Sequence, residues 1–297
     1  MERSWVGVAR LTGLEPDLVE QSVRQALEED RATADVTTRT LVPRDQLGRG
    51  VVVAKATGVL SGYAIAGAAF EVVDDRVIWG TYCSDGDALE PGLQIMDVEG
   101  ELASILRAER VALNFLTHLS GVATAAHGVV RALEGTHCRL RDTRKTIPGL
   151  RALEKYAVRM GGGTNHRLDL ADGFLVKDNH LAALRARGLG IKDAVRLARE
   201  AQPGMRIEVE VTSLEEAGEA LAAGADELLL DNMSPGEMRN VVAMVEGHDP
   251  RPALEASGGI TLANAREVAE TGVDYISMGA ITHSAKALDM SLEVEVG

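Results

Sequence analysis

Residues 206–231 read RIEVEVTSLEEAGEALAAGADELLLD, and this stretch decides the fold class. Alternating apolar side chains over Arg206–Val211 predict a strand, and apolar residues at helical spacing over Ser213–Ala223 predict a helix. The apolar run Glu227–Asp231 predicts a second strand. Two strands joined through a helix at so short an interval are typical of a right-handed βαβ unit in a parallel sheet.

The same pattern recurs on both sides of this stretch, with one strand and one helix about every 20–25 residues, as in chains of βαβ units. The apolar runs predict further strands at Cys138–Asp142, Gly173–Lys177, Ala253–Ala256 and Asp274–Met278. Periodicity predicts further helices at Leu150–Met160, Ile191–Gln202, Pro235–Glu246 and Leu262–Thr271, the last two capped by Ser234 and Thr261. Because a complete barrel has about eight such strands, we expect an incomplete α/β barrel.

The first third of the chain reads as mixed α and β rather than as a repeat. Helices are expected at residues 15–30, Gly62–Val73, Glu101–Leu119 and Gly121–Leu133, the last two separated by a break around Ser120-Gly121. Short strands are expected at Gly50–Ala56, Val77–Tyr82 and Gln94–Val98. After about His283 the βα pattern stops, so we expect the tail to pack elsewhere.

The composition excludes several classes of protein. A formal net charge of −14 argues against a surface that holds nucleic acid or an anionic membrane. No apolar stretch approaches the roughly 20 residues of a bilayer span, and the first residues lack the layout of a secretory signal. The two cysteines, Cys83 and Cys138, have no metal-binding spacing. We therefore expect a reduced, cytoplasmic protein.

Reactive side chains gather at the carboxyl ends of the predicted strands, where α/β barrels place their active sites. In chain order these ends carry Arg144, Lys145, Lys177, Glu210, Asp231, the turn Ser257-Gly258-Gly259 and the turn Gly279-Ala280. Residues 139–167 contain eight Lys or Arg residues and only two carboxylates. A cationic region inside an acidic chain indicates a small polyanionic ligand rather than a polymer.

The glycine-rich turns have a use in phosphate binding. Ser257-Gly258-Gly259 precedes the helix expected from Thr261, and backbone N–H groups at such a place can hold a phosphate that glycine allows to approach closely. Residues 161–163 are three glycines that match no nucleotide-binding fingerprint. We expect them to let the chain wrap close to a ligand while His166 and Arg167 reach in.

The chain also carries a series of short motifs. They are ERVALN at 109–114, SGVAT at 120–124, DTRKTIPG at 142–149, GTNHR at 163–167, VKDNH at 176–180, EVEV at 208–211 and EASGGI at 255–260. Their order, from about Asp35 to His283, resembles that of the quinolinate phosphoribosyltransferase family. Two departures are Ala34 in place of Gly and Val176 in place of Ile, and neither is a group expected to do chemistry.

The resemblance implies both a fold and a reaction. It implies an N-terminal α/β sandwich domain over residues 1–114, joined by the tail 284–297, and the incomplete barrel over residues 115–283. The implied reaction transfers the phosphoribosyl group of phosphoribosyl pyrophosphate to quinolinate with decarboxylation. The products are nicotinate mononucleotide, CO2 and pyrophosphate, in de novo NAD biosynthesis with Mg²⁺ as cofactor. The resemblance also implies a homodimer in which Arg110 of one subunit reaches the site of its partner.

Site residues carry over motif by motif. The positions that hold substrate carboxylates and phosphates are matched by Arg110, Thr143, Arg144, Lys145, His166, Arg167 and Lys177. Glu210 and Asp231 match positions near the ribose hydroxyls and the metal. The turns around the 5′-phosphate are matched by Ser257, Gly258, Gly259, Met278, Gly279 and Ala280. The candidate catalytic residues are Lys145, Lys177, Glu210 and Asp231.

The chemistry of these side chains agrees with the implied reaction. Quinolinate carries two adjacent carboxylates, which suit bidentate Arg and point-charge Lys. Mg²⁺ would be carried mainly by the pyrophosphate, with Glu210 and Asp231 as candidate ligands. Glu208 has the strand parity of Glu210, and His180 and His283 fall near strand ends, so their roles stay open. Which lysine assists decarboxylation also stays open.

Three alternatives remain at this point. A related phosphoribosyltransferase acting on nicotinate, or a protein of the kind encoded near molybdate transporters, could share much of this motif set. A barrel aldolase could use Lys177 as a Schiff-base nucleophile, which requires a desolvated lysine. A binding or scaffold protein could retain the barrel, but no cation or carboxylate is missing from the strand ends.

Overall fold

The computed structural model describes residues 4–296, except for the side chain of Leu11. Internal contacts divide the chain into two compact units. Unit 1 consists of Met1–His127, Thr146–Gly162 and Ile281–Gly297, and unit 2 consists of Gly128–Lys145 and Gly163–Ala280. The boundary expected at residue 114 falls inside a helix, α5, that runs from Leu102 to Ala132.

Unit 2 contains a sheet of parallel strands, in the order β6-β11-β10-β9-β8-β7. Its strands are β6 (Arg139–Arg141), β7 (Phe174–Val176), β8 (Ile207–Val211), β9 (Glu227–Asp231), β10 (Ala253–Ser257) and β11 (Tyr275–Ser277). The six strands predicted from the sequence are all present, and the incomplete α/β barrel is confirmed.

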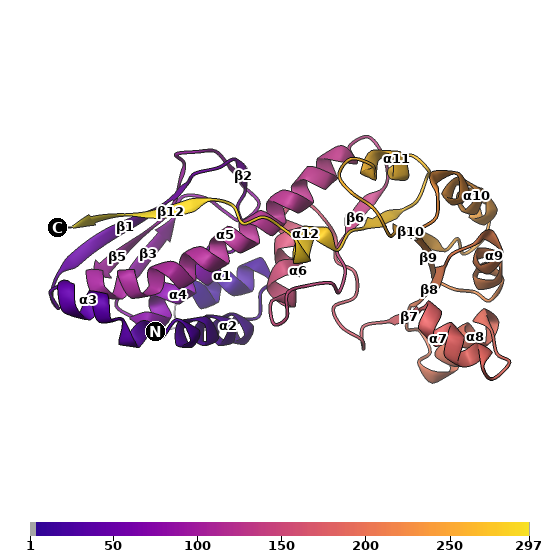
Figure 1. The fold of residues 1–297 in the computed structure, drawn as a ribbon, viewed down its shortest axis with the longest axis horizontal. Coiled ribbons are helices and arrows are strands. Elements are labelled where there is room, and N and C mark those ends of the chain that lie inside the picture. The colour runs from indigo at the N-terminus through magenta and orange to yellow at the C-terminus, as the bar shows by residue number, and fades with distance from the viewer. Residues whose placement is uncertain (1–3, 297) are drawn as a thin grey trace. The chain divides into compact units, whose positions relative to one another are not determined.

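Helices connect these strands and cover the outer face of the sheet. They are α7 (Asp178–Arg185), α8 (Ile191–Ala201), α9 (Leu214–Ala222), α10 (Pro235–Val245) and α11 (Ala265–Ala269). Figure 1 shows α9 and α10 alongside β8, β9 and β10, and α9 contacts both β8 and β9. The helix residues Val195, Ala217 and Val241 and the strand residues Val209 and Leu228 are all buried.

The inner face of the same strands is polar near its middle, which is unusual for a barrel interior filled by branched apolar side chains. Because side chains alternate along a strand, Glu208 and Glu210 share a face, and the register places Glu208 opposite Glu227 and Glu255 opposite Tyr275. This face carries the candidate site.

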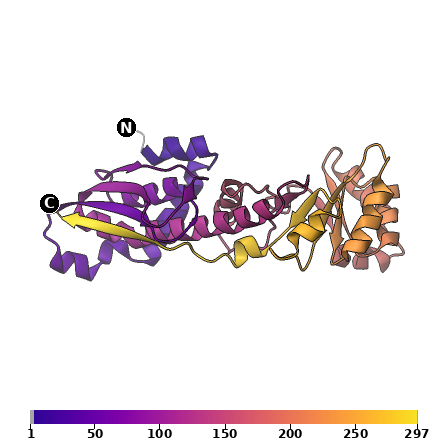
Figure 2. The same ribbon diagram turned by 90° about the horizontal axis from the view of Figure 1, so that it is seen from above.

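Unit 1 is built on an antiparallel sheet in the order β12-β1-β5-β3. Its strands are β1 (Leu47–Ala54), β3 (Ile78–Thr81), β5 (Gln94–Glu101) and β12 (Met290–Val296), with a separate pair formed by β2 (Gly58–Val59) and β4 (Ala88–Leu89). The C-terminal strand β12 pairs with β1 from Met290↔Ala54 to Val296↔Gly48, and Figures 1 and 2 show the two strands side by side.

Helices complete unit 1. They are α1 (Ser4–Thr12), α2 (Pro16–Glu29), the 3₁₀ turn η1 (Ala32–Ala34), α3 (Val36–Leu41), α4 (Tyr63–Val73), α6 (Arg151–Met160) and α12 (Ala280–His283), which starts at the last residue of unit 2. Helix α4 contacts α1 and α2 and buries Ile65 and Phe70, while α1 buries Trp5. Among the described residues, no helix is both long and apolar enough to cross a membrane.

The break predicted around Ser120-Gly121 is wrong, because α5 runs through it without interruption. Small residues there serve close packing instead. The backbone N–H of Ser61 donates to Oγ of Ser120 at 3.0 Å, and a Cβ on Gly121 would lie 2.3 Å from the carbonyl oxygen of Lys286. A Ser-Gly pair therefore marks a close approach of other chain segments here, and it does not end the helix.

Two further expectations need correction. The helix expected from Thr261 begins instead at Ala265, because Thr261 and Asn264 form a turn in which Oδ1 of Asn264 accepts from the Thr261 N–H at 2.7 Å. No strand was expected at β12, although Leu292–Val296 alternates apolar and acidic side chains. The elements α1, α3, α7, α12, η1, β2 and β4 were not expected either, because they are short or lack clear periodicity. By contrast, Ser234 caps α10 as predicted, accepting from the Glu237 N–H.

Candidate active site

Two predicted site residues at the ends of neighbouring strands form an ion pair. Nζ of Lys177, directly after β7, lies 2.9 Å from Oε2 of Glu210 near the end of β8. The Lys177 side chain is 45% exposed and that of Glu210 is 11% exposed, so both are accessible from the carboxyl edge of the sheet. Asp231 and Ser257, the last residues of β9 and β10, pair in register and extend the same edge.

Helix α7 fixes the backbone at Lys177. The Lys177 N–H donates to Nδ1 of His180 at 2.9 Å, so the histidine side chain reaches back over the first turn of the helix. This places His180 as a support for Lys177, a role that the sequence left open. His283 instead contacts its neighbour Ser284, with Nδ1 2.6 Å from the hydroxyl oxygen.

Cationic side chains follow β6 and the glycine loop. Arg144 is half-buried and Lys145 is exposed, and the Lys145 N–H donates to Oγ1 of Thr143 at 2.9 Å. Arg167 is 8% exposed and its guanidinium donates to the carbonyl oxygen of Gly173 at 3.0 Å. Burial, and after it the positive charge of Arg144, lowers the pKa of Arg167. Two neighbouring positive charges favour the binding of an anion that neutralises both of them.

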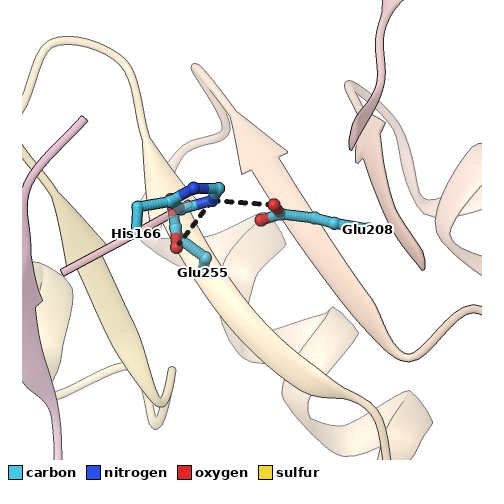
Figure 3. Close-up of side chains that lie close together, drawn as sticks. All are labelled: His166, Glu208 and Glu255. Atoms are coloured by element: carbon cyan, nitrogen blue, oxygen red, sulfur yellow. Dashed lines mark hydrogen bonds and ion pairs between the residues drawn. The ribbon is translucent and has the colours of Figure 1, made fainter. Parts of the chain in front are cut away.

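His166 lies in a buried cluster with two glutamates, drawn in Figure 3. Its Nε2 is 2.8 Å from Oε2 of Glu208 and 3.8 Å from Oε2 of Glu255. Burial, the largest influence, would lower the pKa of His166, but the hydrogen bond and charge of Glu208 and the charge of Glu255 together raise it. The Arg167 N–H donates to Nδ1 at 2.8 Å, so in the neutral ring the proton sits on Nε2 and is donated to Glu208.

A second buried cluster adjoins the first through Glu255. Arg141 donates from Nη1 to Glu255 at 2.8 Å and from both Nη atoms to Glu227 at 3.1 Å, and its guanidinium stacks 3.3 Å from the ring centroid of Tyr275. Burial, followed by the charge of Glu208, raises the pKa of Glu255. Arg141, Glu227 and Glu255 are not among the predicted site residues. Charged residues at inward positions inside apolar strands were the signal that could have identified them.

The cluster of His166, Glu208 and Glu255 has the spacing of a metal site, with candidate ligand atoms within 4.8 Å of one another. Its hydrogen bonds argue against that use. Nε2 carries a proton in both the neutral and the charged ring, and the Arg141 guanidinium already occupies the Glu255 carboxylate. The arrangement therefore fits a shared proton better than a metal ion.

The turn after β10 requires glycine. Gly258 and Gly259 have φ values of +88° and +62°, in the left-handed region. A Cβ on Gly258 would also lie 2.3 Å from Oδ1 of Asn232, whose own N–H donates to the carbonyl oxygen of Ser257. Beside it, the Met278 N–H donates to the carbonyl oxygen of Arg141, and Gly279 and Ala280 follow. Both turns thus lie at the carboxyl edge of the sheet.

The predicted site residues are divided between the two units. All of them except Arg110 belong to unit 2, and the structure brings Lys177 next to Glu210 and His166 next to Glu208. Arg110 lies in unit 1, on α5, and is exposed. His118, also on α5, binds Glu154 of α6, with Nε2 2.9 Å from Oε1.

Comparisons with known proteins agree with one another. A model of the quinolinate phosphoribosyl transferase C-terminal domain matches residues 122–293, and a model of the N-terminal domain of that family matches residues 35–120. The chain is similar to a nicotinate-nucleotide pyrophosphorylase (carboxylating) from Mycobacterium leprae, 42% identical over 96% of this chain and 100% of the relative. It is also similar to the quinolinate phosphoribosyltransferase (decarboxylating) 2b of Nicotiana tabacum, 36% identical over 93% of this chain and 82% of the relative.

A solved structure extends the similarity to the fold. The nicotinate-nucleotide pyrophosphorylase from Francisella tularensis superposes with a TM-score of 0.87 and 38% identity, covering 94% of this chain and 96% of that chain.

Proposed function

This chain belongs to the quinolinate phosphoribosyl transferase family, and we propose that it transfers the phosphoribosyl group of phosphoribosyl pyrophosphate to quinolinate with decarboxylation. The products are nicotinate mononucleotide, CO2 and pyrophosphate, in the biosynthesis of NAD. The observation that carries the proposal is the pair of guanidinium side chains that follow β6 and the glycine loop, with Arg144 half-buried and Arg167 buried. Two guanidinium groups suit a small ring with two adjacent carboxylates, because each can bind one carboxylate in a bidentate manner.

The carboxylates on β8 and β9 suit the ribose. Cleavage of the bond between C1 and pyrophosphate builds positive charge on the sugar, so positioning and charge stabilisation account for most of the catalysis. Glu210 and Asp231 stand at the ends of neighbouring strands and can hold the hydroxyls and stabilise that charge. Lys177, already paired with Glu210, supplies the opposite charge for a phosphate or carboxylate oxygen.

The available oxygen donors fit an Mg²⁺ ion that is coordinated mainly by the pyrophosphate. Hard oxygen ligands from one or two carboxylates plus phosphates are what Mg²⁺ prefers, and Glu210 and Asp231 offer such oxygens. When bound, the ion would neutralise the leaving pyrophosphate. The turns at Ser257–Gly259 and Gly279-Ala280 would hold the 5′-phosphate of the sugar through backbone N–H groups.

Decarboxylation follows attachment of the ring. Once the ring nitrogen is bonded to C1 it is positively charged, and it stabilises the electron pair left on the neighbouring carbon when CO2 departs. That carbon then takes up a proton. The cationic side chains Arg144, Lys145 and Arg167 would hold the ring while the bond breaks.

The Schiff-base alternative has little support from the geometry. Lys177 forms an ion pair with Glu210 and is 45% exposed, whereas a Schiff-base lysine is desolvated so that its amine is neutral. The nicotinate alternative is tested by binding. Isothermal titration should show tighter binding of quinolinate than of nicotinate, and Arg144→Ala should remove most of that difference. Equal affinities in the wild-type protein would count against quinolinate as the acceptor.

We also propose that the protein is a cytoplasmic homodimer in which Arg110 completes the site of the partner subunit. The exposure of Arg110 on α5 and its position in unit 1 support this proposal. Mixing two inactive variants, Arg110→Ala and Lys177→Ala, and allowing their subunits to exchange should restore activity, because one site of each mixed dimer carries neither substitution. No recovery after proven exchange would contradict the shared site.

A further inference from the structure

Asp142 is a fully buried carboxylate that the mechanism above does not use. It follows β6 directly and its relative exposure is 0%. Oδ1 accepts from the backbone N–H of His166 at 2.9 Å, and Oδ2 accepts from Nδ2 of Asn165 at 2.5 Å. A buried carboxylate is costly unless such donors compensate it, so these contacts constrain the two segments strongly.

The backbone around Asp142 reinforces this connection. The Thr164 N–H donates to the carbonyl oxygen of Leu140 at 2.8 Å, and the Asp142 N–H donates to the carbonyl oxygen of Thr164 at 3.1 Å. Arg141 and Thr164 thereby form a parallel bridge beside β6. The segment that follows the three glycines is therefore attached to the free edge of the sheet, with the Asp142 side chain at its end.

Each of the two segments joined at Asp142 carries a cationic side chain close to the connection. Arg144 lies two residues after Asp142, and Arg167 is next to His166. The two segments therefore carry like charges, so the hydrogen bonds that join the segments determine where Arg144 and Arg167 lie relative to each other. Asp142 is the side chain that joins the two segments through hydrogen bonds to both the main chain and a side chain.

We propose that Asp142 is a positioning residue that fixes the separation of Arg144 from Arg167 and thereby sets the selectivity for an acceptor with two adjacent carboxylates. The inference rests on the proposed function for its substrate, but the hydrogen bond to His166 can be tested without any substrate. In this proposal Asp142 acts through its hydrogen bonds to Asn165 and His166 and does not contact the acceptor.

The test compares Asp142→Ala with Asp142→Asn and with a control at the opposite end of the sheet. Asp226 precedes β9, and its carboxylate accepts from the Ile207 N–H at 2.7 Å and pairs with Arg199 at 3.0 Å. Asp226→Ala therefore removes a carboxylate–backbone bond and an ion pair away from the site. In Asp142→Ala the KM for quinolinate should rise by roughly tenfold to a hundredfold, the usual effect of losing an outer partner of a binding group, with little change in the KM for phosphoribosyl pyrophosphate. Asp142→Asn should recover part of the loss, because an amide oxygen can still accept from the His166 N–H. Asp226→Ala should leave both KM values unchanged.

Amide hydrogen exchange measured by NMR gives a second readout that is independent of activity. The His166 amide should lose protection in Asp142→Ala and keep it in Asp226→Ala. If Asp142→Ala does not fold, as judged by circular dichroism, Asn165→Ala removes one of the two bonds and should raise the KM for quinolinate by a smaller factor.

Unchanged protection of the His166 amide, or equal increases in both KM values, would overturn the inference. If the wild-type protein does not use quinolinate but Asp142→Ala still reduces the protection of the His166 amide, the proposed function is wrong. The claim about selectivity would then be wrong as well.

Discussion

Nζ of Lys177 and Oε2 of Glu210 lie 2.9 Å apart at the ends of two neighbouring parallel strands. In the proposed function, Lys177 binds a phosphate or carboxylate oxygen of a substrate and Glu210 binds the ribose. The pair would then contact two different parts of the reacting molecules. It is partly open to solvent, and a pair of this kind contributes about 1 kcal/mol or less to stability. Its position at the carboxyl edge is better explained by the proposed catalysis than by stability.

Lys177→Ala and Glu210→Gln should therefore each reduce turnover by roughly 100-fold or more, the usual effect of removing a charge aimed at a transition state. The urea midpoint should change little. Arg185→Ala is the matched control, because Arg185 forms a similar 2.8 Å pair with Glu216 outside the site. Near-normal rates in either site variant would contradict the assignment.

Arg141→Ala should strongly destabilise the protein. Its removal leaves the buried Glu255 without its 2.8 Å ion pair and leaves Glu227 with Arg206 as its remaining cation, which costs roughly 3–5 kcal/mol in the free energy of unfolding. Arg206→Ala removes a second, 46% exposed partner of Glu227 and should cost about 1 kcal/mol or less.

The measurement for this pair is urea unfolding followed by circular dichroism. The double variant Arg141→Met with Glu255→Gln should regain part of the loss, since one uncompensated charge is then removed. Equal losses in the free energy of unfolding for Arg141→Ala and Arg206→Ala would contradict a large contribution of the buried cluster to stability.

The stability of the protein should depend on pH through His166. The pKa of His166 is raised in the folded state, because Glu208 and Glu255 outweigh the effect of burial. Its contribution is therefore complete below the unfolded value of about 6.5 and is lost as pH rises through the folded pKa. The free energy of unfolding, measured in urea at several pH values, should decline over that window in the wild type and decline less in His166→Gln.

His137→Gln is the control for that pH series. The His137 side chain is 62% exposed, and its Nε2 lies 3.8 Å from Oδ1 of Asp274, farther than the 2.8 Å between His166 and Glu208. Its stability curve should run parallel to that of the wild type. A His166→Gln curve that also runs parallel would refute the coupling.

Gly121→Ala should destabilise unit 1, whereas Gly128→Ala on the same helix should not. The new Cβ at position 121 would lie 2.3 Å from a backbone oxygen, and the required shift costs about 1–3 kcal/mol. Nothing lies within 4 Å of a Cβ at position 128, so alanine there should add about 0.5–1 kcal/mol through its helix propensity. Thermal unfolding of the two variants measures the contrast, and effects of the same sign would contradict it.

The sequence predicted the barrel well because its information is local. Alternating apolar residues in Arg206–Val211 and helical spacing in Ser213–Ala223 are each complete within a short segment, and β8 and α9 fall close to these ranges. The strand-end residues Lys177, Glu210 and Asp231 followed from the same pattern, since parallel strands bring their carboxyl ends to one edge.

The remaining features depend on contacts distant in sequence. The glycine at position 121 of α5 is explained by the close approach of Lys286, and the bond of His166 to Glu208 joins residues 42 positions apart. Arg141 resembled one more surface cation in a basic stretch, and only the register of β6, β9 and β10 places it between Glu227 and Glu255. A local pattern can mark Arg141 as facing inward, but it does not identify the partners of Arg141.

The central claim is tested most directly by incubating the protein with quinolinate, phosphoribosyl pyrophosphate and Mg²⁺ and following CO2 and nicotinate mononucleotide together, with nicotinate as the control acceptor. We predict that quinolinate yields CO2 and nucleotide in equal amounts and that nicotinate yields little product. A protein that converts nicotinate but not quinolinate would contradict the account. The cations around Arg144 and Arg167 would then serve a different acceptor.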